Sequence, residues 1–193
     1  MKNTIIHLIG TPGVGKYTIG GHVAAMTGAR FVDNHSVANV IFNLLPIDGV
    51  TPLPEGVWDR VSQVRAAVLD TVAHLSPPEM SFVFTNYMRG ADPVEYEAFL
   101  HMVALADARQ SVFVPVVLRC DTAELRRRIV APSRRERMKM VDPVQGARLN
   151  ELPEFDTDHP NKLRLDVTSV EPADAARLIV DWAQRCNAGT RED

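Results

Sequence analysis

The sequence predicts an α/β fold in which one parallel sheet is covered by helices on both faces. Three observations lead to this prediction: five short apolar segments, amphipathic segments between them, and a glycine-rich loop after the first of them. Strands that are buried on both faces of a parallel sheet are apolar nearly throughout, as the first of these segments is. The sequence shows no internal repeat, so we predict a single domain over residues 1–193.

The first strand and the first helix flank the glycine-rich loop. Residues 4–9 (TIIHLI) form a mostly apolar run that predicts a buried strand. After the loop, Ile19, Val23 and Met26 recur at the spacing of one helix face, and Gly28 follows as a stop signal. The order of strand, glycine loop and helix is the context that a phosphate-binding loop requires.

The loop reads GTPGVGKYT over residues 10–18 and departs at one position from the phosphate-binding pattern G-x-x-x-x-G-K-[ST]. Its glycines let successive backbone N–H groups turn toward an anion, and Lys16 adds a mobile positive charge. We therefore assign polyphosphate binding to the whole loop: Gly10, Thr11, Pro12, Gly13, Val14, Gly15, Lys16, Tyr17 and Thr18.

The departure from the pattern is Tyr17, which stands where Ser or Thr normally binds magnesium. A phenol oxygen lies much farther from its Cα than that hydroxyl and cannot take its place. Thr18 carries the next hydroxyl and becomes the candidate metal ligand, although one residue later on a helix points about 100° away. The loop thus predicts a phosphate site and leaves its metal contact open.

The remaining elements follow in the same alternating order. Apolar and β-branched runs predict the other strands, at residues 30–33, 81–85, 111–118 and 163–167. Periodic apolar positions and capping residues predict helices at residues 34–44, 57–75, 92–103, 121–129 and 171–182. Pro115 lies inside the fourth strand and cannot donate a ladder hydrogen bond, so we expect a bulge or an unpaired stretch there.

Charge is distributed unevenly along the chain. The net charge is −3, but residues 119–148 hold nine Lys or Arg against four acids, a local +5 that leaves −8 elsewhere. Such a basic segment suits nucleic acid or a polyphosphate, and the loop favours polyphosphate. No apolar run reaches the roughly 18 to 20 residues that span a membrane. We therefore expect a cytoplasmic protein without nucleic-acid or membrane partners.

Four features together resemble the P-loop small-molecule kinases related to shikimate, gluconate and nucleoside-monophosphate kinases. They are the glycine loop, a carboxylate at the end of the second strand, an arginine-rich segment after the fourth strand and a final strand–helix pair. The resemblance implies a strand order of 2-3-1-4-5, a lid at about residues 126–145, ATP and Mg²⁺ as cofactors, and a small-molecule phosphoryl acceptor. It also implies that Lys16 and the loop amides hold the β- and γ-phosphates while lid arginines neutralise the transferred group. We expect a monomer or a homodimer.

Asp33, Arg134 and Arg135 are the candidate catalytic residues besides Lys16. Asp33 ends a strand beside the loop, where ligands bind in open α/β sheets, and could orient or deprotonate the acceptor hydroxyl. It could equally cap the next helix. The two arginines follow a break at residues 131–133, and guanidinium groups suit phosphate oxygens, although a run of charges is often only solvated surface.

Four further residues are candidates for ligand contacts. Arg127 could stack on adenine, as the resemblance implies, or pair with Glu124 one helical turn before it. Arg65, on the polar face of its helix, could reach an anionic substrate or lie at the surface. Asn86 and Arg89 follow the third strand and are expected to face the cleft that binds the acceptor.

Three functions are compatible with these features to different degrees. An ATP-dependent kinase acting on a hydroxyl or phosphate of a small metabolite or nucleotide agrees with loop, lid and length. A nucleotide-binding regulatory protein with weak or no transferase activity is the alternative, because Tyr17 removes the usual metal hydroxyl and Thr85-Asn86 replaces a Walker B acid. A GTPase is disfavoured, because the nearest match to N-K-x-D, at residues 161–164, lacks the aspartate.

Overall fold

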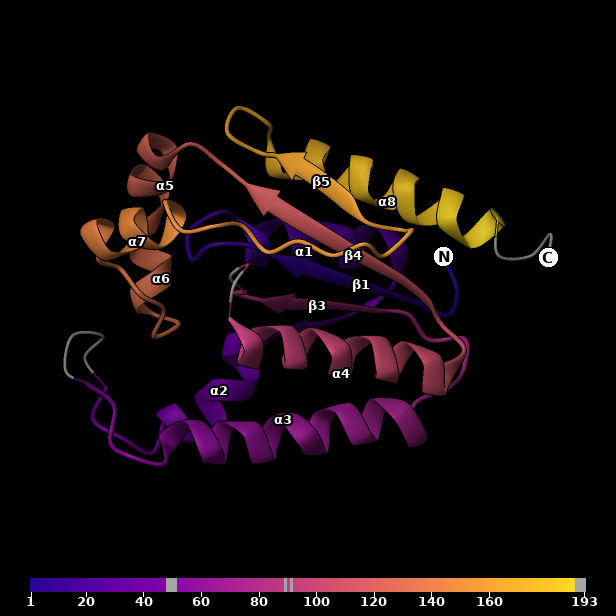
Figure 1. Ribbon diagram of the computed structural model, residues 1–193, viewed down its shortest axis with the longest axis horizontal. Helices are drawn as coiled ribbons and strands as arrows, with labels where there is room; N and C mark the ends of the chain where they lie inside the picture. The colour runs from indigo at the N-terminus through magenta and orange to yellow at the C-terminus, as the bar shows by residue number, and fades with distance from the viewer. Residues whose placement is uncertain (48–51, 89, 91, 190–193) are drawn as a thin grey trace.

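A computed structural model of the protein describes every residue except 48–51, 89, 91 and 190–193. Its sheet consists of five strands: β1 (Thr4–Ile9), β2 (Arg30–Asp33), β3 (Phe82–Asn86), β4 (Val112–Arg119) and β5 (Leu163–Asp166). All four strand pairs are parallel, and the spatial order is β2-β3-β1-β4-β5 (Figure 1). The predicted five-stranded parallel sheet and its order are therefore confirmed.

Helices cover both faces of this sheet. The described helices are α1 (Lys16–Thr27), α2 (Asn34–Phe42), α3 (Val57–His74), α4 (Pro93–Arg109), α5 (Thr122–Ile129), α6 (Pro132–Arg135), α7 (Pro143–Asn150) and α8 (Pro172–Gly189). Figure 1 shows α8 on one side of the strands and α3 and α4 on the other, with α5 to α7 beyond the carboxyl ends of the strands. Throughout the described chain, none of the helices combines the length and the apolar character that crossing a membrane requires.

The central strand β1 is apolar on both faces because each face meets a layer of helices. Ile6 and Leu8 belong to the core cluster that includes α1 and α8, whereas Ile5 and Ile9 belong to the cluster that includes α3 and α4. All four side chains are completely buried. This alternation with a period of two is what a strand between two helix layers needs. Because the glycine loop follows the last residue of β1, it lies at the carboxyl edge of the sheet.

Pro115 in β4 resolves one of the expectations from the sequence. It lies opposite His7 of β1, and the register on this side continues without an offset, so the described strand contains no bulge there. On the other side, β5 pairs with β4 only from Val116 onward. The side chain of Asn161 donates a hydrogen bond to the carbonyl of Phe113 (3.0 Å) just before that point. The expected unpaired stretch is therefore present on the β5 side, and the expected bulge is not.

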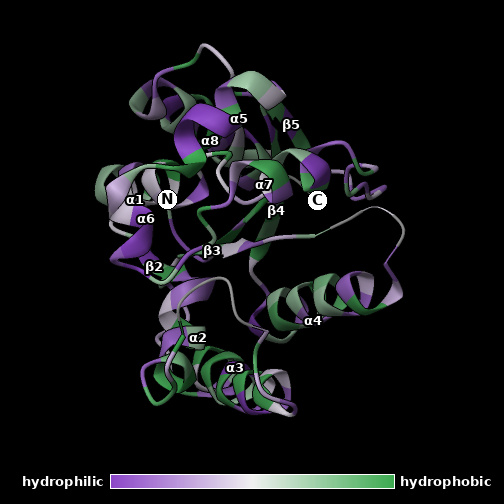
Figure 2. Ribbon diagram, turned by 90° about the vertical axis from the view of Figure 1, so that its left-hand side faces the viewer, coloured by the Kyte–Doolittle hydropathy of each residue, from purple (hydrophilic) through white to green (hydrophobic). Residues whose placement is uncertain are grey.

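The helices α2 and α3 form a small core of their own. This core contains Ala38, Phe42, Val57 and Val61, and Met138 from the segment after α6 packs against it. Figure 2 shows this helix pair below β2 and the main sheet. The basic segment after β4 and the α2–α3 pair therefore meet near the carboxyl end of β2.

Candidate functional site

The glycine loop connects β1 to α1 in a conformation that favours glycine. Gly13 and Gly15 have φ values of 99° and 115°, which L side chains rarely adopt. A Cβ atom at Gly10 would collide with the carbonyl oxygen of Leu118 on β4. Such a loop presents the amino end of α1 to a ligand, and the backbone amides and helix dipole there attract anions.

Lys16 is folded back onto this loop. Its Nζ donates hydrogen bonds to the carbonyls of Gly10 and Thr11, the second at 3.0 Å. Burial lowers the pKa of Lys16 from 10.5 to about 7, and the nearby charges of Arg134 and Lys139 lower it further in the same direction. An ammonium group held among other cations is stabilised strongly by an anionic ligand, so the free site favours polyphosphate.

The lowered pKa of Lys16 predicts proton uptake when ATP binds. At about pH 8.5 the free protein holds Lys16 mostly neutral, and bound phosphate favours the ammonium. We expect uptake of about one proton per ATP and an affinity that falls by up to about tenfold per pH unit above pH 7. Calorimetry in buffers of different ionisation enthalpy measures the uptake, and a value near zero would contradict the prediction.

The lowered pKa of Lys16 also determines the direction in which the free energy of unfolding changes with pH. The unfolded chain keeps the Lys16 proton up to its ordinary pKa of 10.5, whereas the folded protein releases it near pH 7. Between these values the unfolded chain binds more protons, so the contribution of Lys16 to the free energy of unfolding rises with pH. Urea unfolding at several pH values should show a smaller rise in Lys16→Met than in the wild type.

Asp33 lies at the carboxyl end of β2 and faces the cavity. Its carboxylate accepts a hydrogen bond from Thr85 Oγ1 (2.9 Å) and pairs with Lys139 Nζ (3.0 Å). The side chains of Asp33 and Lys139 are only 6% and 9% exposed. Within the described residues, the carboxylate makes no capping hydrogen bond to α2, and the backbone N–H of Asn34 donates to Thr85 instead. The Asp33 side chain therefore lines the cavity and does not cap α2, and its role toward an acceptor hydroxyl stays a prediction.

The two predicted lid arginines point in different directions. Arg134 lines the cavity, and its Nε and Nη2 both donate to the carbonyl of Met140, at 3.0 and 2.8 Å. Arg135 is exposed and is not among the described residues that line the cavity. One residue along a helical turn rotates a side chain by about 100°, which separates the neighbours. Arg137 and Lys139, farther along the same segment, line the cavity together with Arg134.

Tyr17, near the end of the loop, lies against the segment that follows α6. Its ring contacts Phe31 of β2, with the ring centroids 5.5 Å apart. The guanidinium carbon of Arg137 and the Nζ of Lys139 each lie 4.3 Å from the centroid of the Tyr17 ring. The face of an aromatic ring attracts cations within about 6 Å. The phenol ring is therefore a contact point for two cations of the segment that follows α6.

Arg127 and Arg128 lie on α5 and share Glu124 as a partner. Arg127 makes hydrogen bonds of 2.8 and 2.6 Å to Glu124 and is exposed where it lines the cavity. Arg128 donates to the carbonyls of Val14 (3.0 Å) and Val167 (2.8 Å), so it ties the loop to the turn after β5. The pairing predicted for Arg127 is present, and its contact with adenine stays a prediction.

Besides Asp33, two further predicted substrate residues can be placed. Asn86 lines the cavity, with its Oδ1 3.0 Å from Nε2 of His7. Burial lowers the pKa of His7 to about 4, so this histidine is neutral. Arg65 donates to Asn34 Oδ1 (2.8 Å) and is not among the described residues that line the cavity. Arg89 lies outside the described residues.

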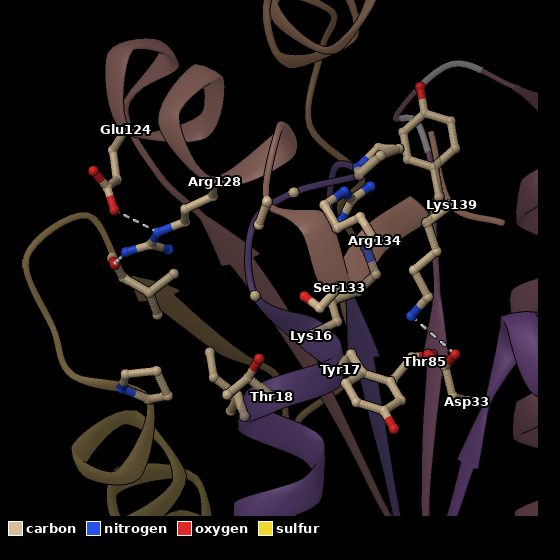
Figure 3. Close-up of a pocket in the computed structure, with 18 of the residues that line it drawn as sticks. Lys16, Tyr17, Thr18, Asp33, Thr85, Glu124, Arg128, Ser133, Arg134 and Lys139 are labelled. Atoms are coloured by element: carbon tan, nitrogen blue, oxygen red, sulfur yellow. Dashed lines mark hydrogen bonds and ion pairs between the residues drawn. The ribbon is translucent and has the colours of Figure 1, made fainter. Parts of the chain in front are cut away.

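A cavity of about 620 Å³ joins these groups (Figure 3). Its size suits a small ligand such as a nucleotide. The sequence-predicted residues that line it are Pro12, Gly13, Gly15, Lys16, Tyr17, Thr18, Asp33, Asn86, Arg127 and Arg134. Those described residues that do not line it are Gly10, Thr11, Val14, Arg65 and Arg135.

The cavity fits a polyphosphate well and a protein-held magnesium ion poorly. Magnesium needs oxygen ligands in a near-octahedral arrangement. The residue after Lys16 presents a ring, and Asp33 is already paired with a lysine. Figure 3 shows Thr18, the predicted metal ligand, and Asp33 on opposite sides of the Tyr17 ring. No group of three or more His, Cys, Asp or Glu in the described part of the chain could hold a metal ion.

No protein-family model matches the chain, and neither does any curated protein. Solved structures do match: the gluconokinase from Sinorhizobium meliloti superposes with a TM-score of 0.65 at 16% identity, over 98% of this chain and 96% of its own. This chain has the fold of the P-loop small-molecule kinases. The kinase fold is shared by the shikimate kinase from Aquifex aeolicus (TM-score 0.55, 14% identity, 96% and 98% covered). It is also shared by the tunicamycin resistance protein from Deinococcus radiodurans (TM-score 0.57, 14% identity, 93% and 94% covered).

Three residues of this kinase-fold cavity were not singled out as site residues from the sequence. Lys139 and Arg137 belong to the basic segment, but no periodic pattern distinguishes them from its other charges. Thr85 had a usable signal, because it lies opposite Asp33 in the register of β2 and β3. Two polar residues at the carboxyl ends of neighbouring parallel strands lie at the edge where ligands bind.

Proposed function

We propose that the protein is an ATP-dependent phosphotransferase that moves the γ-phosphoryl group to a hydroxyl or phosphate of a small metabolite or nucleotide. One observation carries the proposal: the cations Lys16, Arg134 and Lys139 line one cavity together with the carboxylate of Asp33. Phosphoryl transfer depends mainly on positioning and on stabilisation of negative charge, and this arrangement provides groups for both. The fold shared with kinases, whose chemistry generally involves a nucleotide and a metal, supports it.

The nucleotide is assigned to the loop end of the cavity. The amino end of α1 and Lys16 bind the β- and γ-phosphates, and Arg134 and Lys139 approach the same region from the lid. Residues 168–172, from the turn after β5 to the first residue of α8, line this end together with Arg127 and bound the space for the base. In this arrangement positive charge surrounds the γ-phosphoryl group on two sides, which stabilises the charge that develops during transfer.

The acceptor is assigned to the end of the cavity at the β2 and β3 termini. The carboxylate of Asp33 orients the acceptor hydroxyl or takes its proton, and the hydrogen bond from Thr85 fixes the carboxylate. Asn86 and His35 line the same end. Burial, with the charge of Lys139 beside it, lowers the pKa of His35 to about 4, so His35 contributes hydrogen bonds and no charge.

A nucleotide-binding regulatory protein is the second candidate function, and one observation favours it. Lys139 is paired with Asp33 at 3.0 Å, so the carboxylate must exchange this partner before it receives a proton from an acceptor. A protein that uses the pair only to close its lid would bind nucleotide and transfer nothing. Both candidate functions therefore predict ATP binding, and only the phosphotransferase predicts a phosphorylated product.

A screen of phosphoryl acceptors tests the proposed function. The purified protein is incubated with ATP and panels of hydroxylated metabolites and nucleoside monophosphates, and products are detected by mass spectrometry. We expect at least one acceptor to gain a phosphoryl group, because the cavity places charge stabilisation beside a candidate base. Lys16→Ala is the matched control, since a contaminating kinase would survive it. Tight ATP binding without any product would support the regulatory function.

A further inference from the structure

Tyr17, Asp33 and Lys139 form a cluster in which Lys139 contacts both other side chains, an arrangement that the loop motif does not require. The Nζ of Lys139 lies 3.0 Å from Asp33 Oδ2 and 4.3 Å from the centroid of the Tyr17 ring. Figure 3 shows the Lys139 side chain reaching toward Asp33, with the Tyr17 ring nearby. Lys139 and Asp33 are both almost completely buried. A single ammonium group thus contacts the residue after Lys16 and the carboxylate at the end of β2.

These two contacts are the ones that a magnesium ion would need. In the motif G-x-x-x-x-G-K-[ST], the residue after the lysine ligates the metal through its hydroxyl oxygen. Here that residue is Tyr17, whose ring face cannot ligate magnesium but attracts an ammonium group. The carboxylate of Asp33, which could serve a divalent ion, serves the same ammonium. The loss of the hydroxyl and the presence of the lysine are therefore two parts of one arrangement.

The backbone around Lys139 fixes the ammonium in this place. Met138, directly before it, has a φ of 50° and packs against the core of α2 and α3. The N–H of Lys139 donates to the carbonyl of Arg134 (2.9 Å), and Asn39 of α2 donates to the carbonyl of Arg137 (3.4 Å). A tight turn that is held at both ends delivers Lys139 to the cavity. Its position is set by these contacts and is not that of a mobile surface lysine.

We propose that Lys139 is a built-in cation that takes the place of a protein-held magnesium ion. Lys139 neutralises the phosphates of a bound nucleotide from the lid side, and the protein contributes no ligand to a divalent metal. The inference rests on the proposed nucleotide binding. Any metal ion that enters the site is then held by the nucleotide alone.

Thermodynamic linkage makes this inference measurable. A protein that ligates the metal binds the ATP–metal complex more tightly than free ATP. By linkage, the protein–ATP complex then binds the metal more tightly than free ATP does, by the same factor. A protein that adds no ligand binds both forms similarly. Calorimetry with ATP plus saturating Mg²⁺, and with ATP plus EDTA, gives the ratio of the two affinities. For the wild type we expect a ratio within about threefold of one.

Two variants extend the test. Lys139→Met should weaken ATP binding in EDTA by about tenfold, because the lid loses its cation. Tyr17→Ser combined with Lys139→Met restores the hydroxyl and vacates Asp33, so the ratio should rise to about tenfold or more in favour of Mg²⁺. Arg126→Met is the matched control: Arg126 is exposed on α5, and its loss removes one charge from outside the cavity lining. It should change neither value.

The outcomes separate this inference from the proposed function. A wild-type ratio above about tenfold would show that the protein ligates the metal, which overturns the inference and leaves ATP binding intact. Unchanged ATP affinity in a folded Lys139→Met would also overturn it. Absence of ATP binding in both media would overturn both proposals. The wild-type ratio requires no variant, so poor folding of a variant does not remove the test.

Discussion

Replacing Lys16 by alanine is expected to weaken ATP binding by about tenfold to a hundredfold, since a charge-assisted phosphate contact contributes roughly 1.5–3 kcal/mol. The loop amides remain in this variant, so weak binding should persist. The loss exceeds that of an ordinary surface lysine because Lys16 lies in the loop among other cations that repel it until an anion arrives. Isothermal titration calorimetry at neutral pH measures the change.

The matched control for Lys16→Ala is Lys162→Ala. Lys162 pairs with Asp156 (2.8 Å) ahead of β5 and is not among the described residues that line the cavity. Removing this surface ion pair should leave ATP affinity unchanged, because Lys162 lies outside the described cavity lining. It should also change stability little, because exposed ion pairs contribute little to it. Thermal unfolding must show that both variants are folded. Equal ATP affinity in wild type and folded Lys16→Ala would reject the phosphate site at the loop.

The phosphate loop and the sheet could be predicted from the sequence because both depend on local patterns. The apolar alternation of β1 places Ile6 and Leu8 against one helix layer and Ile5 and Ile9 against the other. The glycines of the loop have positive φ values, and this local steric requirement is what makes glycine necessary there. Such signals lie within a few neighbouring residues and need no knowledge of distant contacts.

The side of the cavity that the basic segment after α5 forms could not be predicted in the same way. Whether Arg134 or Arg135 faces the cavity depends on the rotation of the short helix α6, which no periodic pattern fixes. Lys139 reaches Asp33 only because Met138 takes a positive φ and packs on the α2–α3 core. These positions follow from tertiary packing, which single charged residues in a basic run do not reveal.

Tyr17 illustrates how one residue can be interpreted differently at the two levels. In the sequence it is the loss of a hydroxyl ligand, and the phosphate cradle does not need it. In the structure its ring contacts Phe31 and two cations of the segment after α6, so it joins the glycine loop to that segment. The side chain that removes a metal hydroxyl thus contacts two cations instead. These contacts depend on the tertiary position of Arg137 and Lys139, so the sequence does not reveal them.

Asp33→Asn is expected to lower turnover by about a hundredfold to ten-thousandfold, the usual contribution of a positioned general base. The amide keeps the shape of the carboxylate and can still accept from Thr85, but it cannot take a proton from the acceptor. ATP affinity should not fall, because the substitution removes a negative charge beside Lys139 and leaves the cations that face the phosphates in place. Steady-state kinetics with the acceptor found by screening, together with ATP calorimetry, measures both quantities.

The variant should also lose stability, by about 3–5 kcal/mol, because it leaves the buried ammonium of Lys139 without its partner. Asp33→Asn combined with Lys139→Met removes both charges and should regain most of that loss. The pair of variants separates two roles that the single substitution mixes. If the double variant is stable and inactive while Lys139→Met alone retains turnover, Asp33 acts in the transfer itself. Recovery of turnover together with stability would reduce the pair to a lid contact and contradict a role for Asp33 as base.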